Sequence, residues 1–170
     1  MNEKEIIRML LDNGRITDME MAGKLRISAQ AVGKIRKKLE ENGIIEGYSC
    51  ILNFEKMGIN IFACILAKLK GNYWKEIGDR RAREILKNVP IAITSCLPSS
   101  SDITYSAMYG FRDAKEMDNY SFLAKAKFID YYDIVHIYPF SCGNLLKNSP
   151  NQLFKLILDD KPIIPVGFPK

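Results

Sequence analysis

The sequence has few of the residues that build catalytic and metal sites. Histidine occurs once, at His136, and tryptophan once, at Trp74. The four cysteines are widely separated, at positions 50, 64, 96 and 142, and none forms the CxxC pair that zinc sites and redox couples use. We therefore expect no metal, no cofactor and no catalytic residue. We interpret the cysteines as buried free thiols, because cysteine among apolar neighbours behaves as a small hydrophobe.

Long hydrophobic runs are also absent. The longest apolar stretch, residues 59–69, is interrupted by Asn60 and Lys68 and is shorter than the roughly 20 residues that a membrane span requires. The first residues, Met-Asn-Glu-Lys-Glu, lack the basic start and apolar centre of a secretory signal. We expect a cytoplasmic protein with no membrane partner. A chain of 170 residues with 47% hydrophobic and 26% charged residues is typical of two small folded domains.

The first 47 residues carry the pattern of three short helices. Apolar residues recur with a helical period over residues 4–11. Thr17 and Glu20 form a capping box for a second helix, and Ser28 is a good N-cap for a third helix that Gly43 ends. Only a few residues around position 27 separate the second and third helices. This is the spacing of a helix-turn-helix motif.

The positive charge of this segment is concentrated on the third helix. The net charge is +5, but residues 1–47 carry nine basic and eight acidic side chains, whereas residues 24–38 contain six basic residues and no acid. Val32, Ile35 and Leu39 follow the spacing of a buried face, which leaves the basic residues largely outward. Such a face suits the phosphates and base edges of the major groove. The predicted DNA-binding residues are Thr17, Ser28, Ala29, Gln30, Gly33, Lys34, Arg36, Lys37 and Lys38.

A lysine-rich helix face alone is more often a solvated surface. The conjunction of two capped helices, a short turn and a basic third helix with no acid before Glu40 favours DNA binding instead. Gly33 costs about 1 kcal/mol relative to alanine inside a helix, so it indicates a close approach to DNA or to a neighbouring helix. The sequence leaves these two explanations of Gly33 open.

Three segments of the headpiece, residues 1–53, resemble the Lrp/AsnC family of transcriptional regulators. Residues 12–17 (DNGRIT) are similar to the family's D-G-R-I-S/T, and residues 25–28 (LRIS) to its turn. Residues 39–48 (LEENGIIEGY) are similar to its L-E-x-x-G-V/I-I-x-G-Y. The family commonly has a basic residue and then an apolar one where this chain has Ile35 and then Arg36. Base and phosphate contacts are therefore assigned jointly to Lys34, Arg36 and Lys37.

The remaining sequence predicts a second domain of the ferredoxin-like type. A strand connector over residues 44–52 precedes it, and its order is βαββαβ, with both helices on one face of the sheet. The expected elements are a strand over 59–69, a helix over 74–88, strands over 91–97 and 103–111, a helix from 113 to about 126, and a strand over 133–138 that Pro139 ends. The fold class is thus α+β, with a winged helix-turn-helix domain followed by a ferredoxin-like ligand-binding and dimerisation domain.

We place the domain boundaries at 1–53, 54–142 and 143–170. The last segment is interpreted as a tail that contains a helix over 152–158 and an extended strip over 161–165, and that wraps a neighbouring subunit. The uncovered face of the sheet predicts a homodimer, which would present two recognition helices to a two-fold DNA site.

The resemblance also implies a small effector and larger assemblies. Lrp/AsnC regulators bind amino acids or related molecules between subunits and form dimers that assemble further, here into tetramers or octamers. The family's G-x-x-D loop corresponds to residues 99–102, so Ser100, Ser101 and Asp102 are candidate effector-binding residues. Serine and aspartate are also standard turn residues, and that interpretation is favoured about two to one.

Two alternative functions are weighed against a sequence-specific regulator of transcription. The first is a chromatin-like architectural protein that coats DNA with little sequence preference. The second is an enzyme resembling sirohaem decarboxylases, which use basic and histidine side chains in the second domain. The single histidine, His136, argues against the enzyme. We therefore predict a double-stranded DNA-binding protein that is not an enzyme.

Overall fold

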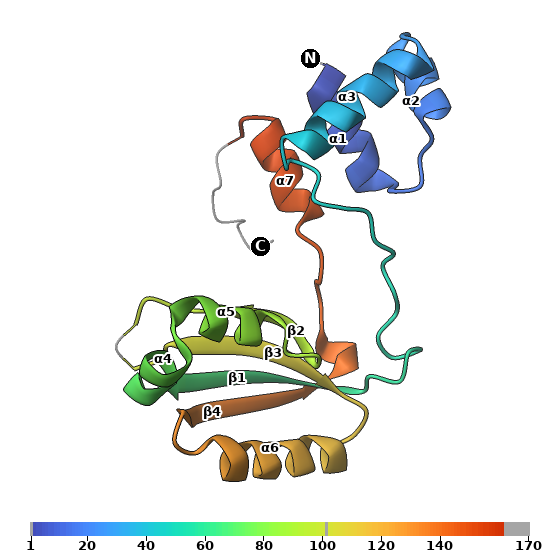
Figure 1. Cartoon of the computed structure of the whole chain (residues 1–170). Coiled ribbons are helices and arrows are strands. Elements are labelled where there is room, and N and C mark those ends of the chain that lie inside the picture. The colour runs from blue at the N-terminus through green and yellow to red at the C-terminus, as the bar shows by residue number, and fades with distance from the viewer. Residues whose placement is uncertain (1, 101, 162–170) are drawn as a thin grey trace. The chain divides into compact units, whose positions relative to one another are not determined.

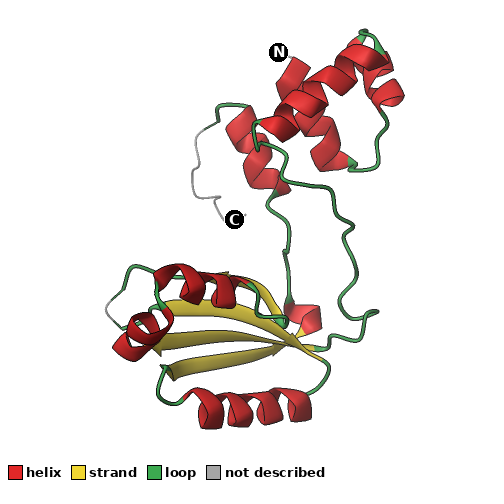
Figure 2. Cartoon of the chain, in the orientation of Figure 1, coloured by secondary structure: helices red, strands yellow, loops and turns green. Residues whose placement is uncertain are grey.

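The structure, a computed structural model, describes residues 2–100 and 102–161 (Figures 1 and 2). Contacts within the chain divide it into two compact units. The first, the headpiece unit, comprises Met1–Ile51 together with Lys147–Lys170, and the second comprises Leu52–Leu146. The described part of the C-terminal segment, up to residue 161, thus belongs to the same unit as the first helices.

Three helices form the headpiece, where the sequence predicts them. They are α1 (Asn2–Asp12), α2 (Asp18–Leu25) and α3 (Ala29–Glu41). Each contributes apolar side chains to one buried cluster, which contains Ile6, Met21, Val32 and Leu39. Ile16, between α1 and α2, is also buried in it. The helical spacing of these apolar residues therefore does become the packed face of each helix.

A fourth helix, α7 (Asn151–Leu158), packs on α1 in the same unit. The side-chain amide of Asn151 donates a hydrogen bond of 2.7 Å to the carbonyl oxygen of Leu11. Around this contact three ion pairs join the two segments: Lys155 with Asp12, Arg8 with Asp159, and Lys4 with Asp160. The expected helix over 152–158 is confirmed, and its location on α1 is new. The expected extended strip over 161–165 lies almost wholly outside the described residues.

The connector after α3 differs from its prediction. Residues 44–52 were expected to form a strand, but none of the described residues between 42 and 60 is in a strand. Ile51 and Leu52 are exposed, and no neighbouring segment pairs with their backbone. A run of apolar and β-branched residues has strand propensity, but it forms a strand only where a partner strand is available. Cys50 lies here and is exposed, so its prediction as a buried thiol is wrong.

The second unit is a four-stranded antiparallel sheet with helices on one face. Its strand order is β2-β3-β1-β4, which is the ferredoxin-like order that the βαββαβ pattern predicts. In chain order the elements are β1 (Ile61–Leu69), α4 (Gly71–Ile77), α5 (Asp79–Lys87), β2 (Ala92–Cys96), β3 (Tyr105–Phe111), α6 (Ala114–Phe128), β4 (Tyr132–Ser141) and the short 3-10 helix η1 (Cys142–Asn144).

Two elements of this unit differ from the sequence prediction. The single helix expected over 74–88 is two helices, α4 and α5, because Gly78 between them has φ of +80°, outside the helical region. The last strand continues past Pro139 to Ser141. β4 is an edge strand, where a proline without an N–H is tolerated.

The two faces of the sheet differ in what covers them. Ala63, Ile65, Tyr105 and Ala107 are buried on one face, against side chains of α4, α5 and α6. The other face carries Leu66 beside His136 and Cys64 beside Tyr138, and Tyr138 is 54% exposed. None of these four side chains is fully buried. From Cys64 onward β1 therefore has one packed face and one face that no described helix covers, whereas Phe62, at the start of the strand, is buried on that second face beside Phe54 and Phe140.

The remaining cysteines also differ from their prediction as buried thiols. Cys96, the last residue of β2, is exposed. Cys64, on the open face of the sheet, and Cys142, which follows β4, are only half-buried. No described helix is long and apolar enough to cross a membrane.

Candidate nucleic-acid interface

Two predicted site residues, Thr17 and Ser28, are the N-caps of the helix-turn-helix. The Thr17 hydroxyl accepts from the backbone N–H of Glu20 (3.2 Å) and donates to the Glu20 carboxylate (2.8 Å). The same carboxylate accepts from the Thr17 backbone N–H at 2.7 Å, which lowers the pKa of Glu20. The Ser28 hydroxyl accepts from the backbone N–H of Ala31 at 3.1 Å. Thr17 thus uses its hydroxyl hydrogen inside the protein, whereas Ser28 has its own left to donate.

The turn between α2 and α3 is tight because Arg26 adopts a left-handed conformation. Its φ is +56°, and its backbone N–H donates to the carbonyl of Ala22. Ile27 also donates to Ala22, at 3.2 Å, and Ser28 begins the next helix. A left-handed residue after the last turn is a common way for a helix to end. Here it ends α2 at Leu25 and lets α3 begin after three intervening residues and pack against α2.

Gly33 lies on the side of α3 that faces the start of α2. A Cβ added to Gly33 would lie 3.2 Å from the Oδ2 atom of Asp18, the first residue of α2. Of the two explanations that the sequence left open, the structure supports the neighbouring helix. Gly33 therefore has a packing role within the headpiece.

Arg36 is held inside the headpiece by two groups. Its guanidinium lies 2.5 Å from the Asp18 carboxylate, with about a quarter of its side chain exposed. Its Nε donates to the hydroxyl of Tyr48 at 3.2 Å, and the guanidinium carbon lies 5.0 Å from the centre of the Tyr48 ring. The Asp18 hydrogen bond raises the pKa of Arg36 above its ordinary value. Arg36 thus ties α3 to α2 and to the connector.

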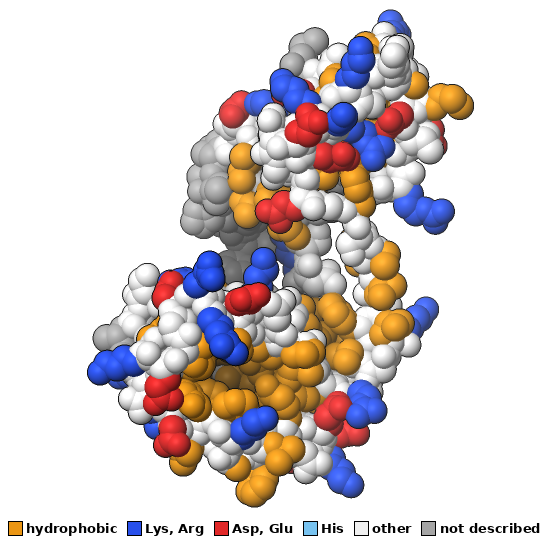
Figure 3. Space-filling model, in the orientation of Figure 1, with side chains coloured by type: hydrophobic (Ala, Val, Ile, Leu, Met, Phe, Trp, Pro, Cys, Tyr) orange, Lys and Arg blue, Asp and Glu red, His pale blue; other side chains and the backbone are white. Residues whose placement is uncertain are grey.

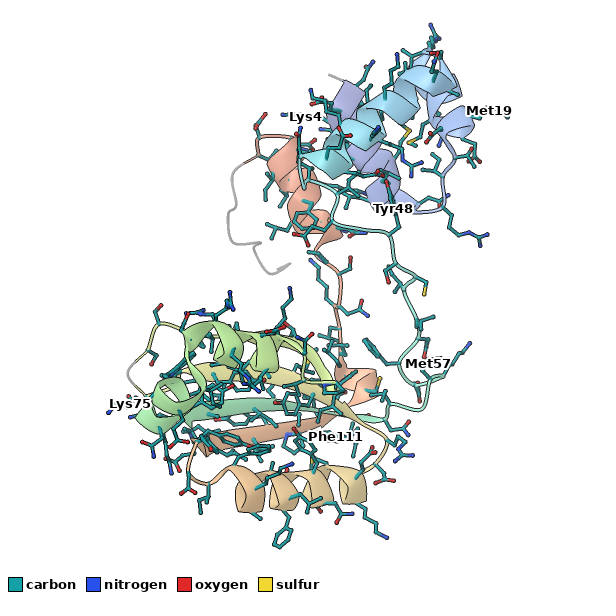
Figure 4. All side chains as sticks on the ribbon, viewed as in Figure 1. Lys4, Met19, Tyr48, Met57, Lys75 and Phe111 are labelled. Atoms are coloured by element: carbon teal, nitrogen blue, oxygen red, sulfur yellow. The ribbon has the colours of Figure 1, made fainter. Side chains whose placement is uncertain are left out.

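Tyr48 was part of a quoted motif, but its contact with Arg36 could not be predicted. Its hydroxyl also donates to the Glu40 carboxylate at 2.8 Å, and partial burial is the main cause that raises the pKa of Tyr48. Figure 4 labels Tyr48, which follows α3 in the chain. The contact joins residues 12 positions apart through an irregular connector, so no periodic pattern reports it.

The three lysines of the predicted site differ in how they are held. Lys38 pairs with Glu3 of α1 at 2.8 Å, and this hydrogen bond raises the pKa of Lys38 and lowers that of Glu3. Lys37 lies 3.7 Å from Glu41 with most of its side chain exposed, which is a weak surface pair. Lys34 is exposed and forms no ion pair with any described residue.

The exposed side of α3 therefore carries fewer of the predicted DNA-binding residues than the sequence indicated. Gln30, Lys34 and Lys37 are exposed and follow the spacing i, i+4, i+7, which places them on one side of the helix. Ala29, in the first turn, is half-buried. We call Gln30, Lys34 and Lys37 the outer α3 face. It presents one amide and two ammonium groups to solvent.

The candidate effector loop has a turn of its own. The Ser100 hydroxyl accepts from the backbone N–H of Asp102 at 3.3 Å, a local hydrogen bond that stabilises a turn. Asp102 is exposed. Ser101 lies outside the described residues. His136, which bears on the enzyme alternative, is exposed on the open face of the sheet, with its ring 5.6 Å from that of Tyr138.

The comparisons with known proteins agree with this geometry. Residues 2–46 match the model of the winged helix-turn-helix DNA-binding family. The leucine-responsive regulatory protein of Rhizobium meliloti is 40% identical over 68 residues, which are 40% of this chain and 44% of that protein. The chain spans about half the length of the curated relatives that it matches first.

Solved structures of low sequence identity share the fold over most of the chain. An AsnC family transcriptional regulator from Agrobacterium tumefaciens superposes with a TM-score of 0.69 at 16% identity, covering 87% of this chain and 92% of that one. A transcriptional regulator from Neisseria meningitidis, solved as a complex with L-Met, superposes with a TM-score of 0.70 at 16% identity, covering 89% and 97%. The α+β fold class, with a helix-turn-helix domain before a ferredoxin-like sheet, is thereby confirmed.

The headpiece is thus similar to the winged helix-turn-helix DNA-binding domains over residues 2–46. The resemblance to the Lrp/AsnC transcriptional regulators that the sequence indicated is confirmed, by the relatives of the headpiece and by the shared fold of the chain.

Proposed function

We propose that this protein is a sequence-specific regulator of transcription that binds double-stranded DNA as a homodimer in the cytoplasm. The observation that carries the proposal is the outer α3 face. Gln30, Lys34 and Lys37 are exposed, and Lys37 is held only by a weak surface pair with Glu41, whereas Arg36 and Lys38 form hydrogen-bonded ion pairs within the headpiece. Relatives of the headpiece are named as transcriptional regulators, which supports the same role and favours a protein that is not an enzyme.

The residues of the predicted site then have distinct roles. Gln30, in the first turn, can form two hydrogen bonds to adenine in the major groove, and Lys34 can donate to the acceptors of guanine or to a phosphate. Lys37, one turn further, is suited to phosphate. The Ser28 hydroxyl can donate a hydrogen bond to a phosphate of the DNA backbone, and Ala29 can contact a thymine methyl group. Thr17, Gly33, Arg36 and Lys38 hold the helix in position and contribute indirectly.

A homodimer through the open face of the sheet would supply the two-fold symmetry. Leu66 and Tyr138 lie on this face together with the half-buried Cys64. An apolar sheet face exposed to water is a typical interaction surface. A copy of the same face would cover it and would carry a second headpiece for the other half-site. Assembly of dimers into tetramers or octamers would extend the same arrangement.

An amino-acid effector is the second part of the proposal. The Neisseria meningitidis regulator of the same fold was solved with L-Met, and the exposed carboxylate of Asp102 could accept hydrogen bonds from an ammonium group. The Ser100 turn would hold that carboxylate in place, with Ser101 as its neighbour. Titration calorimetry with leucine and methionine tests this part, and Asp102→Asn should weaken any binding that is found.

A selection from random DNA tests the main proposal. The full chain should enrich a two-fold sequence, and that sequence should resist competition by random DNA at raised salt. The variant Gln30→Ala should relax the preference at one base pair of each half-site, whereas Gln152→Ala, on the exposed side of α7, should leave the selected sequence unchanged. Enrichment of no sequence would favour the architectural alternative, and absence of DNA binding would refute both.

A further inference from the structure

A cavity opens in the second unit on the helix-covered face of the sheet. It has a volume of about 120 Å³ and lies between the sheet, α5 and α6. Ile65 and Tyr109 line its sheet side, Leu86 comes from α5 and Ala124 from α6. Figure 3 shows hydrophobic side chains gathered in a hollow of this unit. Ile85 and Phe128, which also line the cavity, are 45% and 38% exposed, so the two helices do not close over it.

The lining has no charged side chain. Its polar groups are tyrosine hydroxyls and one serine, Ser121. Burial raises the pKa values of Tyr105, Tyr109 and Tyr120, and raises that of Tyr132 to about 12, so all four remain neutral phenols at physiological pH. An ion would lose its hydration here without a counter-ion, at a large cost in free energy. The cavity therefore suits a neutral ligand and excludes a zwitterionic amino acid.

The cavity has a pair of buried hydroxyls on its sheet side. The hydroxyls of Tyr105 and Tyr109 lie 3.0 Å apart and are buried. Each phenol has one hydrogen and two lone pairs. One hydrogen is used between the two oxygens. The side chains of Tyr120 and Ser95 lie within hydrogen-bonding reach of this pair, so a ligand would share a small cluster of hydroxyls that can both donate and accept. A ligand with one hydroxyl or carbonyl can therefore bond to this pair.

The shape and the aromatic character of the lining favour a ring. Tyrosine is the most frequent lining residue, and the rings meet edge to face: Tyr109 and Tyr120 at 5.8 Å and 87°, Tyr73 and Tyr131 at 6.2 Å and 79°. Aromatic pairs prefer this geometry, and a bound ring can extend it. An engineered apolar cavity of about 150 Å³ in another protein binds benzene, so a cavity of this size holds about one ring.

We propose that this cavity is a binding site for a neutral, single-ring aromatic molecule with one hydrogen-bonding group, of the phenol class. The site lies within one unit of one chain, and it is distinct from the loop of Ser100 and Asp102. The inference does not depend on DNA binding by the headpiece. A ligand here would join α5, α6 and the sheet and would stabilise the second unit against unfolding.

Fluorine NMR with 4-fluorophenol tests the site on the full chain. The wild-type protein should broaden or shift the probe resonance, with one site per chain. Ala124→Phe should fill the cavity and abolish the effect, whereas Leu123→Phe, one residue away and 63% exposed, should retain it. If circular dichroism shows that Ala124→Phe does not fold, Ser121→Phe obstructs the same cavity. The proposal would be overturned if a folded Ala124→Phe or Ser121→Phe protein changed the probe resonance as much as the wild-type protein does. A stoichiometry of one probe per two chains would overturn it as well.

A second comparison tests the hydroxyl pair. The double variant Tyr105→Phe and Tyr109→Phe keeps both rings and removes both hydroxyls. It should weaken 4-fluorophenol binding about fivefold, the effect of one net hydrogen bond, and leave fluorobenzene binding unchanged. Equal losses for both probes would show that the rings and not the hydroxyls were disturbed, and would contradict this assignment. Tighter binding of leucine than of 4-fluorophenol at this site would contradict the ligand class.

Discussion

The guanidinium of Arg36 lies 2.5 Å from the carboxylate of Asp18, and this ion pair joins the middle of α3 to the first residue of α2. A sequence pattern assigns Arg36 to the DNA surface together with Lys34 and Lys37. The ion pair, with Tyr48 on its other side, instead makes Arg36 part of the frame that holds the helix-turn-helix together. Gly33 belongs to the same contact, because it gives Asp18 the space it occupies.

The first prediction distinguishes a residue that stabilises the helix-turn-helix, Arg36, from a residue that contacts DNA, Lys34. Arg36→Gln should lower the free energy of unfolding of the headpiece by about 1 kcal/mol, the upper end for a pair that is partly open to water. Lys34→Ala should change stability little and weaken DNA binding. Thermal unfolding and fluorescence anisotropy on the same samples measure both quantities. A large loss of affinity in a fully folded Arg36→Gln protein would return Arg36 to the DNA surface.

A second prediction concerns α7. Asn151→Ala removes the donor to the carbonyl of Leu11 and should lower the stability of the headpiece by about 1 kcal/mol, the usual worth of one hydrogen bond. Gln152→Ala changes the exposed neighbouring residue and serves as the matched control. Chemical denaturation followed by circular dichroism distinguishes them. Identical midpoints for the two variants would show that α7 does not stabilise α1.

The third prediction is that acid destabilises the headpiece. Hydrogen bonds from Thr17 lower the pKa of Glu20, and Lys38 lowers that of Glu3, each from an ordinary value of 4.5. A group with a lowered pKa in the folded state contributes stability above its unfolded pKa, and this is lost as the pH falls through the folded value. The melting temperature should therefore begin to fall below about pH 5. Glu20→Gln should make this fall shallower; an unchanged pH profile in this variant would refute the role of Glu20.

A fourth prediction addresses the open face of the sheet. Leu66→Lys places a charge at the centre of this face, beside His136, and should convert the proposed dimer to monomers because a buried unpaired charge is costly. Lys87→Glu, an exposed change at the end of α5 on the helix-covered side of the sheet, is the control for a change of charge outside the open face. Analytical ultracentrifugation measures the mass. A dimer that survives Leu66→Lys would mean that a different surface joins the subunits.

The headpiece could be predicted closely because its signals are local. Thr17, Glu20 and Ser28 lie within a few residues of the helix starts that they cap, so sequence spacing alone reveals them. The βαββαβ order was likewise readable from strand and helix periods. Pro139 misled the prediction of the last strand, because only the sheet order shows that β4 is at an edge.

Long-range contacts could not be predicted from one sequence. The pairing of Arg36 with Asp18 and Tyr48, and the packing of α7 on α1 through Asn151, join residues that no repeating pattern relates. The same holds for the cavity, since its depth depends on how far apart α5 and α6 lie over the sheet. Composition shows many tyrosines, but only the fold places Tyr105 against Tyr109.

The salt dependence of DNA binding tests the central claim most directly. For the variant Lys34→Ala with Lys37→Ala, the slope of log K against log salt concentration should fall in magnitude by about two for each protomer, because each lost phosphate contact removes nearly one released counterion. Lys38→Ala, whose ammonium pairs with Glu3, should leave the slope almost unchanged. Equal slopes for the wild-type protein and the double variant, with both proteins folded, would contradict DNA binding through the outer α3 face.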